Sequence, residues 1–190
     1  SSIKLDKTST SVLRGKTVTL KATVSPSDAG NKAVSWSSSD KKIATVDSKG
    51  LVKGVAKGIA TITAKAKDGS GVKATCKITV KQPVTKITLS KTSASILRNK
   101  TITLKATAGP SSANDKSVAW TTSNKKVATV DSKGVVKGIA KGTATITATA
   151  RDGSKVKATC KITVKQPVTK ITLNKKSASI LRNKTITLKV

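Results

Sequence analysis

The sequence predicts an all-β protein built from tandem β-sandwich domains arranged as beads on a string. Two observations support this prediction. An 84-residue segment occurs twice without a gap, with 59 of 84 positions identical between residues 1–84 and 85–168. Within each copy, apolar residues recur at every second position, which is the spacing of a half-buried strand, and no segment has the 3.6-residue spacing of an amphipathic helix.

The length of the repeat indicates an autonomous domain, because solenoid units are roughly 20 to 50 residues long. Residues 169–190 match 85–106 at 19 of 22 positions, so a third copy begins there. We expect domains at 1–82 and 83–166, then the first strands of a third, incomplete repeat at 167–190, in a piece of a longer protein. Residues 80–85 contain one proline and no glycine or serine, which predicts a short, stiff connector.

The strands of the first copy are expected wherever apolar and polar residues alternate between turn signals. Alternation is clearest at 17–24, 60–66 and 72–80. Between the last two segments lies Asp68-Gly69, a pair that tolerates positive φ and predicts an antiparallel hairpin. Shorter strands are expected at 3–5, 11–13, 33–37, 43–46 and 51–53. Seven or so short strands in one 84-residue unit are typical of an immunoglobulin-like sandwich.

The composition argues against an enzyme. The 38 lysines and arginines outnumber the 8 acidic residues, which gives a net charge of +30, and histidine, tyrosine, phenylalanine and methionine are absent. The chain therefore lacks the usual general base and the commonest metal ligand. The aspartates form no D-x-D run typical of a calcium loop, so no cofactor or catalytic residue is expected, and an ion between domains is the weaker alternative.

The tryptophans and cysteines are predicted to be structural. Trp36 and Trp120 have the parity of a core strand, and burying an indole of 150 to 250 Å² stabilises a domain by about 4 to 6 kcal/mol at most. The alternative is a platform on which a sugar or base stacks. Cys76 and Cys160 occur once per unit at inward positions. We expect two buried thiols, with a reactive or crosslinking thiol as the alternative.

Several linked motifs resemble the bacterial immunoglobulin-like domain, group 2. They are Val34-Ser35-Trp36-Ser37-Ser38-Ser39-Asp40, Ile43-Ala44-Thr45-Val46-Asp47, the glycine-spaced segment 50–58, Ala60-Thr61-Ile62-Thr63-Ala64 and Asp68-Gly69, and the second copy repeats them from Val118 to Gly153. The resemblance implies tandem sandwiches on bacterial surface proteins, including intimin-like and invasin-like adhesins, and accessory modules of secreted enzymes and phage tails. It implies no catalytic residue.

The first functional hypothesis is therefore a non-catalytic spacer of a bacterial cell-surface or secreted protein that presents a terminal module. Its first partners would be neighbouring Ig-like domains of the same chain. No apolar segment approaches the roughly 18 to 20 residues that span a bilayer. The location implied is extracellular, at the bacterial surface or secreted.

Two alternatives stay open. The partial third repeat could add its strands to another chain and form a homopolymeric filament, through Ile171, Leu173, Ile186 and Leu188. The lysine-rich surface could adhere to anionic cell-wall polymers or host glycans by charge. Sequence-specific nucleic-acid binding is not expected, because the chain has only four arginines and few aromatic residues for base stacking.

Overall fold

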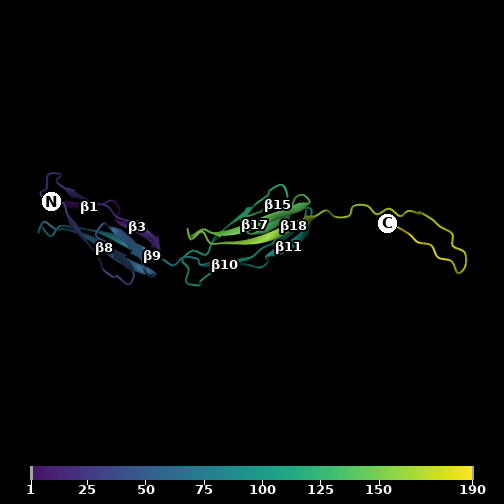
Figure 1. The fold of residues 1–190 in the computed structure, drawn as a ribbon, viewed down its shortest axis with the longest axis horizontal. Helices are drawn as coiled ribbons and strands as arrows, with labels where there is room; N and C mark the ends of the chain where they lie inside the picture. Colours follow the sequence, from purple (N-terminus) through teal and green to yellow (C-terminus); the bar gives the residue numbers. More distant parts are fainter. Residues whose placement is uncertain (1, 190) are drawn as a thin grey trace.

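A computed structural model describes residues 2–189, in which every regular element is a strand. Two sandwiches lie end to end along the long axis, and the C-terminal segment extends beyond the second one (Figure 1). The predicted all-β class and tandem arrangement are confirmed.

The first sandwich contains nine strands. They are β1 (Ser2–Leu5), β2 (Ser9–Leu13), β3 (Thr17–Thr19), β4 (Ala22–Ser25), β5 (Val34–Ser38), β6 (Ala44–Val46), β7 (Leu51–Gly54), β8 (Gly58–Ala66) and β9 (Lys73–Lys81). The predicted hairpin around Asp68-Gly69 is present, because β8 pairs antiparallel with β9.

The second sandwich repeats the same nine strands 84 residues later. They are β10 (Lys86–Leu89), β11 (Ser93–Leu97), β12 (Thr101–Thr103), β13 (Ala106–Gly109), β14 (Val118–Thr122), β15 (Ala128–Val130), β16 (Val135–Gly138), β17 (Gly142–Ala150) and β18 (Lys157–Lys165).

Each sandwich has two layers. In the first sandwich, one sheet has the order β2-β9-β8-β5 and the other has the order β3-β7-β6. The strands β1 and β4 form a separate pair, and β1 contacts β9 and β8. The strand β2 lies parallel to β9, from Ser9 opposite Lys77 to Leu13 opposite Lys81. The second sandwich has the same orders and the same parallel pair, β11 with β18.

The predicted continuous strand at 17–24 is wrong. It is broken at Leu20 and Lys21, because the Leu20 N–H donates to the Gly50 carbonyl at 2.9 Å and the Lys21 N–H donates to a side chain, Oδ1 of Asp6, at 2.8 Å. Alternation of apolar and polar residues continues through such a break, so the pattern alone does not reveal it.

Residues 167–189 contain no strand, although the sequence predicts the first strands of a third repeat there. In the second sandwich, the corresponding strands β11 and β12 pair with β18 and β16, which come later in the repeat. The third repeat has no such partners among the described residues, and isolated strands are marginal in water.

Each sandwich has its own core of small aliphatic residues. Fully buried side chains occupy equivalent positions in the two copies: Leu20 and Leu104, Val52 and Val136, Ile62 and Ile146, Cys76 and Cys160, Ile78 and Ile162. Trp36 and Trp120 are partly buried and pack against these cores from the side. Because the two sets of core residues are separate, each sandwich buries its own apolar surface.

A buried glycine makes room for each tryptophan. Gly50 has a φ of +79°, and a Cβ on it would lie 2.5 Å from the Leu20 carbonyl oxygen and 2.9 Å from Cζ2 of Trp36. Gly134 has the same relation to Leu104 and Trp120. Since both backbone conformation and space are restricted, only glycine fits at this position.

We predict that Gly50→Ala destabilises the first sandwich by about 3 kcal/mol, from the positive φ and from the collision with backbone and indole. Denaturant unfolding in a Trp120→Phe background measures this, because the fluorescence then reports on Trp36 alone. The matched control is Gly69→Ala, where φ is +85° but nothing lies within 4 Å of the added Cβ, and the expected cost is about 1 kcal/mol. Equal losses in the two variants would contradict the packing argument.

Candidate functional site: the junction between the sandwiches

The junction consists of the linker residues 82–85, between β9 and β10, and of loops at the adjoining end of the second sandwich (Figure 1). The Gln82 N–H donates to Oδ1 of Asn114 at 2.7 Å, and the Asn114 N–H donates back to the Gln82 carbonyl at 3.1 Å. The Val84 N–H donates to Oδ2 of Asp152 at 2.5 Å. Two loops of the second sandwich therefore hold the linker backbone.

The side chain of Val84 anchors the same linker. It is 1% exposed and belongs to the second core, together with Ala113 of the loop that carries Asn114. The identical tripeptide Gln-Pro-Val recurs at 166–168, where Val168 is 80% exposed. Since the tripeptide is the same, burial of this valine depends on the loops of the sandwich that follows it.

The first sandwich also contacts the junction. Nζ of Lys57 donates to the Ser112 carbonyl at 3.2 Å. The Arg14 guanidinium donates through Nε to the Val55 carbonyl at 3.1 Å and reaches Oε1 of Gln82 at 3.5 Å. A direct polar link therefore joins the two sandwiches in addition to the linker itself.

Asp152 has two tasks in this arrangement. Its Oδ1 accepts from the Ser154 N–H at 2.9 Å and so closes the turn between β17 and β18, while Oδ2 accepts from Val84. Partial burial raises the pKa of Asp152, but the hydrogen bonds from Ser154 and Val84 outweigh it and hold the pKa below its ordinary value of 3.8. The carboxylate is therefore ionised at neutral pH and accepts charge-assisted hydrogen bonds.

Asn114 and Asp152 together form a clamp on the linker. The first sandwich has a counterpart of only one of these two side chains. The residue that corresponds to Asn114 is Gly30, which has no side chain to accept a hydrogen bond. Asp68 corresponds to Asp152 and accepts from the N–H and Oγ of Ser70, which holds the pKa of Asp68 below its usual value. The aspartate thus forms the same turn in both copies, and contact with the linker is an additional role of Asp152.

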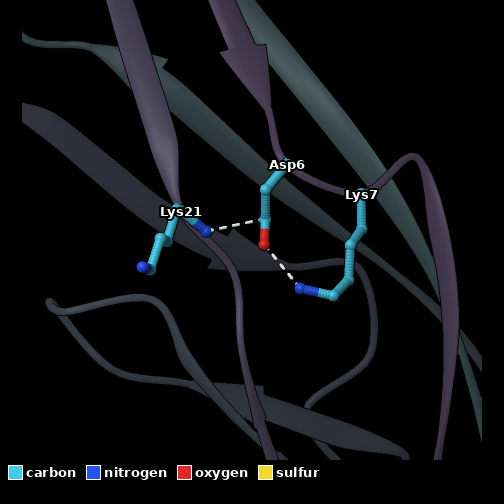
Figure 2. Close-up of polar contacts among 3 residues, drawn as sticks. All are labelled: Asp6, Lys7 and Lys21. Atoms are coloured by element: carbon cyan, nitrogen blue, oxygen red, sulfur yellow. Dashed lines mark hydrogen bonds and ion pairs between the residues drawn. The ribbon is translucent and has the colours of Figure 1, made fainter.

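A second recurrent contact closes the β1-β4 pair (Figure 2). Oδ1 of Asp6 accepts from the Lys21 N–H at 2.8 Å, and Oδ2 pairs with Nζ of Lys7 at 2.5 Å. The hydrogen bond from Lys7 and that from the Lys21 backbone lower the pKa of Asp6. In the next two copies, Ser90 and Asn174 accept the equivalent hydrogen bond, from the N–H of Lys105 and Lys189. Hydroxyl, amide and carboxylate are thus interchangeable here, because the position needs only an acceptor.

The predicted cysteines lie in the two cores, and the predicted tryptophans pack against them. Cys76 and Cys160 are fully buried free thiols, and burial raises the pKa of both. Trp36 and Trp120 are partly buried, each with one edge against a glycine. A structural role for these four residues is consistent with their placement and stays a prediction.

The residues predicted to exchange strands lie in the segment beyond the second sandwich. Ile171, Leu173 and Leu188 are 69%, 46% and 51% exposed, whereas Ile186 is partly buried. Strand exchange through them stays a prediction.

Within residues 2–189, no three side chains of the histidine, cysteine, aspartate and glutamate classes gather to hold a metal ion. The same part of the chain contains no helix long and apolar enough to cross a membrane.

The sequence prediction missed the two residues that clamp the linker, Asn114 and Asp152. The sequence points to Asp152 only through Asp152-Gly153, the second copy of the Asp-Gly motif. A signal for Asn114 exists in the repeat itself, because position 114 differs from its counterpart, Gly30, within a loop next to the connector.

Comparison with known families gives a match to the bacterial Ig-like domain (group 2) over residues 1–78 and again over 83–162. The two matches coincide with the two sandwiches.

The chain spans less than two thirds of the length of each of three similar proteins. An uncharacterised protein of Clostridium acetobutylicum is 36% identical over 162 residues, which are 85% of this chain and 17% of that protein. A kappa-carrageenase of Pseudoalteromonas carrageenovora is 46% identical over 67 residues, 35% of this chain and 17% of the enzyme. An Ig-like virion protein of Serratia phage KSP90 is 36% identical over 156 residues, 79% of this chain and 59% of that protein.

Among solved structures, a C-terminal fragment of intimin, determined in complex with the intimin-binding domain of its translocated receptor, has a TM-score of 0.51. It is 22% identical, over 86% of this chain and 63% of that one. This likeness supports the fold.

We predict that Cys76 and Cys160 do not react with an aromatic disulfide reagent at pH 8 while the sandwiches are folded, because both thiols are buried and their pKa is raised. Two thiols should react per chain once denaturant unfolds the protein. Rapid reaction of either thiol in the native chain would favour the crosslinking alternative.

We predict that the junction loosens in acid as Asp152 is protonated. Its pKa is lower in the folded state than the ordinary 3.8, so its stabilisation is fully present above that value and is lost as the pH falls through the folded pKa. Small-angle scattering from pH 6 to pH 2.5 should show a broader range of interdomain distances in acid while each sandwich stays folded.

Asp152→Asn should produce part of this loosening at neutral pH, since the amide offers one acceptor oxygen in place of two, at a cost of about 1 kcal/mol to the junction. The matched control is Asp68→Asn, which alters the same turn without a linker contact. Equal scattering from the two variants would contradict the role of Asp152.

Proposed function

Because the chain belongs to the bacterial Ig-like domain family, group 2, we propose that it is a stiff, non-catalytic spacer within a longer surface or secreted bacterial protein. It would hold a terminal module at a distance from the surface, with neighbouring Ig-like domains of the same chain as its first partners. The similarity of part of the chain to part of an enzyme and to most of a virion protein supports a role shared by otherwise different proteins.

The observation that supports the proposal most strongly is the clamped junction. A spacer keeps its length only if the linkers between its domains do not bend. Here the backbone of Gln82 and Val84 is hydrogen-bonded to the second sandwich, and the Val84 side chain lies in its core. A four-residue linker held in this way has little of the freedom of a glycine- and serine-rich chain.

The strand order also suits a chain under tension. β2 follows the N-terminal strand, β9 leads into the linker, and the two lie parallel as neighbours. A pull on the two ends of the sandwich therefore drives β2 and β9 in opposite directions along their length. The hydrogen bonds between them are then loaded together, in shear, instead of one after another.

Stretching single molecules tests this proposal. Each sandwich should unfold in a separate event, with an increase in contour length of about 25 nm, because 84 residues extend to roughly 30 nm and the folded length is subtracted. Thr10→Pro should lower the unfolding force of the first sandwich. The Thr8 carbonyl accepts from the Lys77 N–H, and the Arg14 N–H donates to the Lys81 carbonyl. The backbone N–H and C=O groups of even-numbered residues therefore point toward β9, so proline at position 10 removes a hydrogen bond of the sheet.

The matched control is Ser11→Pro. The N–H of Ser11 points away from β9, and β2 is the edge strand of its layer, so this proline removes no hydrogen bond of the sheet. Unfolding at forces too low to detect, or equal weakening by the two prolines, would contradict a spacer built to bear tension.

Adhesion by charge is a second candidate function. Among residues 2–189 only one ion pair is present, between Lys7 and Asp6, against 38 cationic side chains in the chain. The other cationic groups therefore have no carboxylate partner within residues 2–189 and can attract anionic polymers.

A further inference from the structure

A surface groove lies beside the tryptophan of each sandwich. In the second sandwich it has a volume of about 510 Å³ and is lined by Trp120, Thr121, Thr122, Lys125, Thr129 and Val130. The residues at 36–38, 41, 45 and 46 line the equivalent groove of the first sandwich, with about 340 Å³. The groove lies between β14 and β15, at the edge where the two layers of the sandwich meet.

Residues that line the groove have hydrogen-bonding groups that the protein itself leaves free. No acceptor among the described residues takes the indole N–H of Trp120, and no buried side-chain nitrogen there lacks a partner, so this N–H is accessible to solvent. The hydroxyl of Thr122 is engaged, since it donates to the Ala128 carbonyl at 3.0 Å. The hydroxyls of Thr121 and Thr129 have no such bond within residues 2–189 and can bind a ligand.

The charge of the groove is positive. Lys125 lines it, is exposed, and has no ion-pair partner in the described part of the chain. No carboxylate lines it. The nearest acid in sequence, Asp131, has its Oδ1 engaged by the N–H groups of Lys133 and Val135, at 2.9 and 2.8 Å. An anion beside Lys125 would therefore meet an unopposed ammonium group.

The first groove has the same design with a weaker charge. Asp40 adjoins Lys41 there, whereas Asn124 adjoins Lys125 in the second sandwich. A further groove that Trp36 also lines includes Lys21 and Lys49. The side chain of Lys21 points away from Asp6, which binds only its backbone N–H (Figure 2).

We propose that the groove beside Trp120 binds one unit of an acidic polysaccharide. The sugar ring would lie against the indole, the anionic substituent would pair with Lys125, and ring hydroxyls would bond to Thr121, Thr129 and the indole N–H. An aromatic wall with a few convergent polar groups and one cation matches a ligand that is part apolar ring and part anion. This inference goes beyond the spacer role and assigns adhesion to a defined place.

The repeat gives the site a second copy. The two grooves occur at equivalent positions of sandwiches joined by a clamped linker, so a long polysaccharide could occupy both at once. Simultaneous occupancy raises the effective affinity without any new contact. A polymer should thus bind more tightly than a hexasaccharide, provided that both grooves are intact.

The composition supplies the probe for this site. The chain contains two tryptophans and neither tyrosine nor phenylalanine, so its intrinsic fluorescence comes from the two grooves alone. Trp36→Phe leaves Trp120 as the single reporter and replaces one aromatic core residue by another. Unchanged thermal unfolding of each variant would establish that it is folded.

The experiment titrates the Trp36→Phe protein with four ligands of similar length. They are a sulfated galactan hexasaccharide, the same sugar after removal of its sulfates, hexagalacturonate and polyphosphate. We expect a fluorescence change with the sulfated or the carboxylated sugar, and the tighter of the two identifies the anion. The desulfated sugar and polyphosphate should bind at least tenfold more weakly, because each lacks one of the two features.

The substitution that tests the site is Lys125→Gln, with Lys161→Gln as the matched control. Both lysines are exposed, and Lys161 lies on β18, across the sheet from the groove. Lys125→Gln should weaken binding of the acidic hexasaccharide about tenfold, as expected for loss of one charge-assisted hydrogen bond. Lys161→Gln should leave it within about twofold, since it removes the same charge far from the site.

Three results would overturn the proposal: equal weakening by the two lysine variants, polyphosphate binding as tight as that of the acidic sugars, or no change in Trp120 fluorescence with any sugar. The first two would assign the binding to the overall charge. None of them bears on the stretching experiment, so failure of the site and failure of the spacer role are distinguishable.

Discussion

The arrangement of the chain depends on one constraint, which is that the linker backbone has its hydrogen-bond partners in the sandwich that follows it. Gln82 and Val84 bond to Asn114 and Asp152, and the Val84 side chain completes the second core. A linker built in this way is part of a domain, so the angle between sandwiches is set by packing. Val168, in the same tripeptide, has no such loops beside it among residues 2–189 and is 80% exposed.

The repeat conserves physical roles more strictly than residues. Asp6, Ser90 and Asn174 differ in charge and size, but each accepts a backbone N–H from the residue fifteen positions later. Gly50 and Gly134 do not vary, because any Cβ there would collide with backbone and indole. Variation is thus tolerated where one acceptor is needed and excluded where space is the constraint.

Much of the fold is predictable from local patterns. Alternating apolar residues and Asp68-Gly69 located β8 and β9 within two residues, and the repeat located the second sandwich. The break between β3 and β4, the parallel pairing of β2 with β9, and the clamp at Asn114 depend on contacts between distant residues, which periodicity does not report. The sequence suggests a stacking platform at Trp120 but not the groove, because periodicity does not report how the turn between β14 and β15 brings Lys125 and Thr129 beside the indole.

The central claim is that the two sandwiches move as one body, and residual dipolar couplings of the backbone amides measure this most directly. In a weakly aligning neutral medium, the couplings of residues 2–81 and of 86–165 should yield the same alignment tensor, in magnitude and orientation. Two tensors of clearly different magnitude would mean that the sandwiches reorient independently. The linker contacts would then be too weak to set the angle, and the spacer would be flexible.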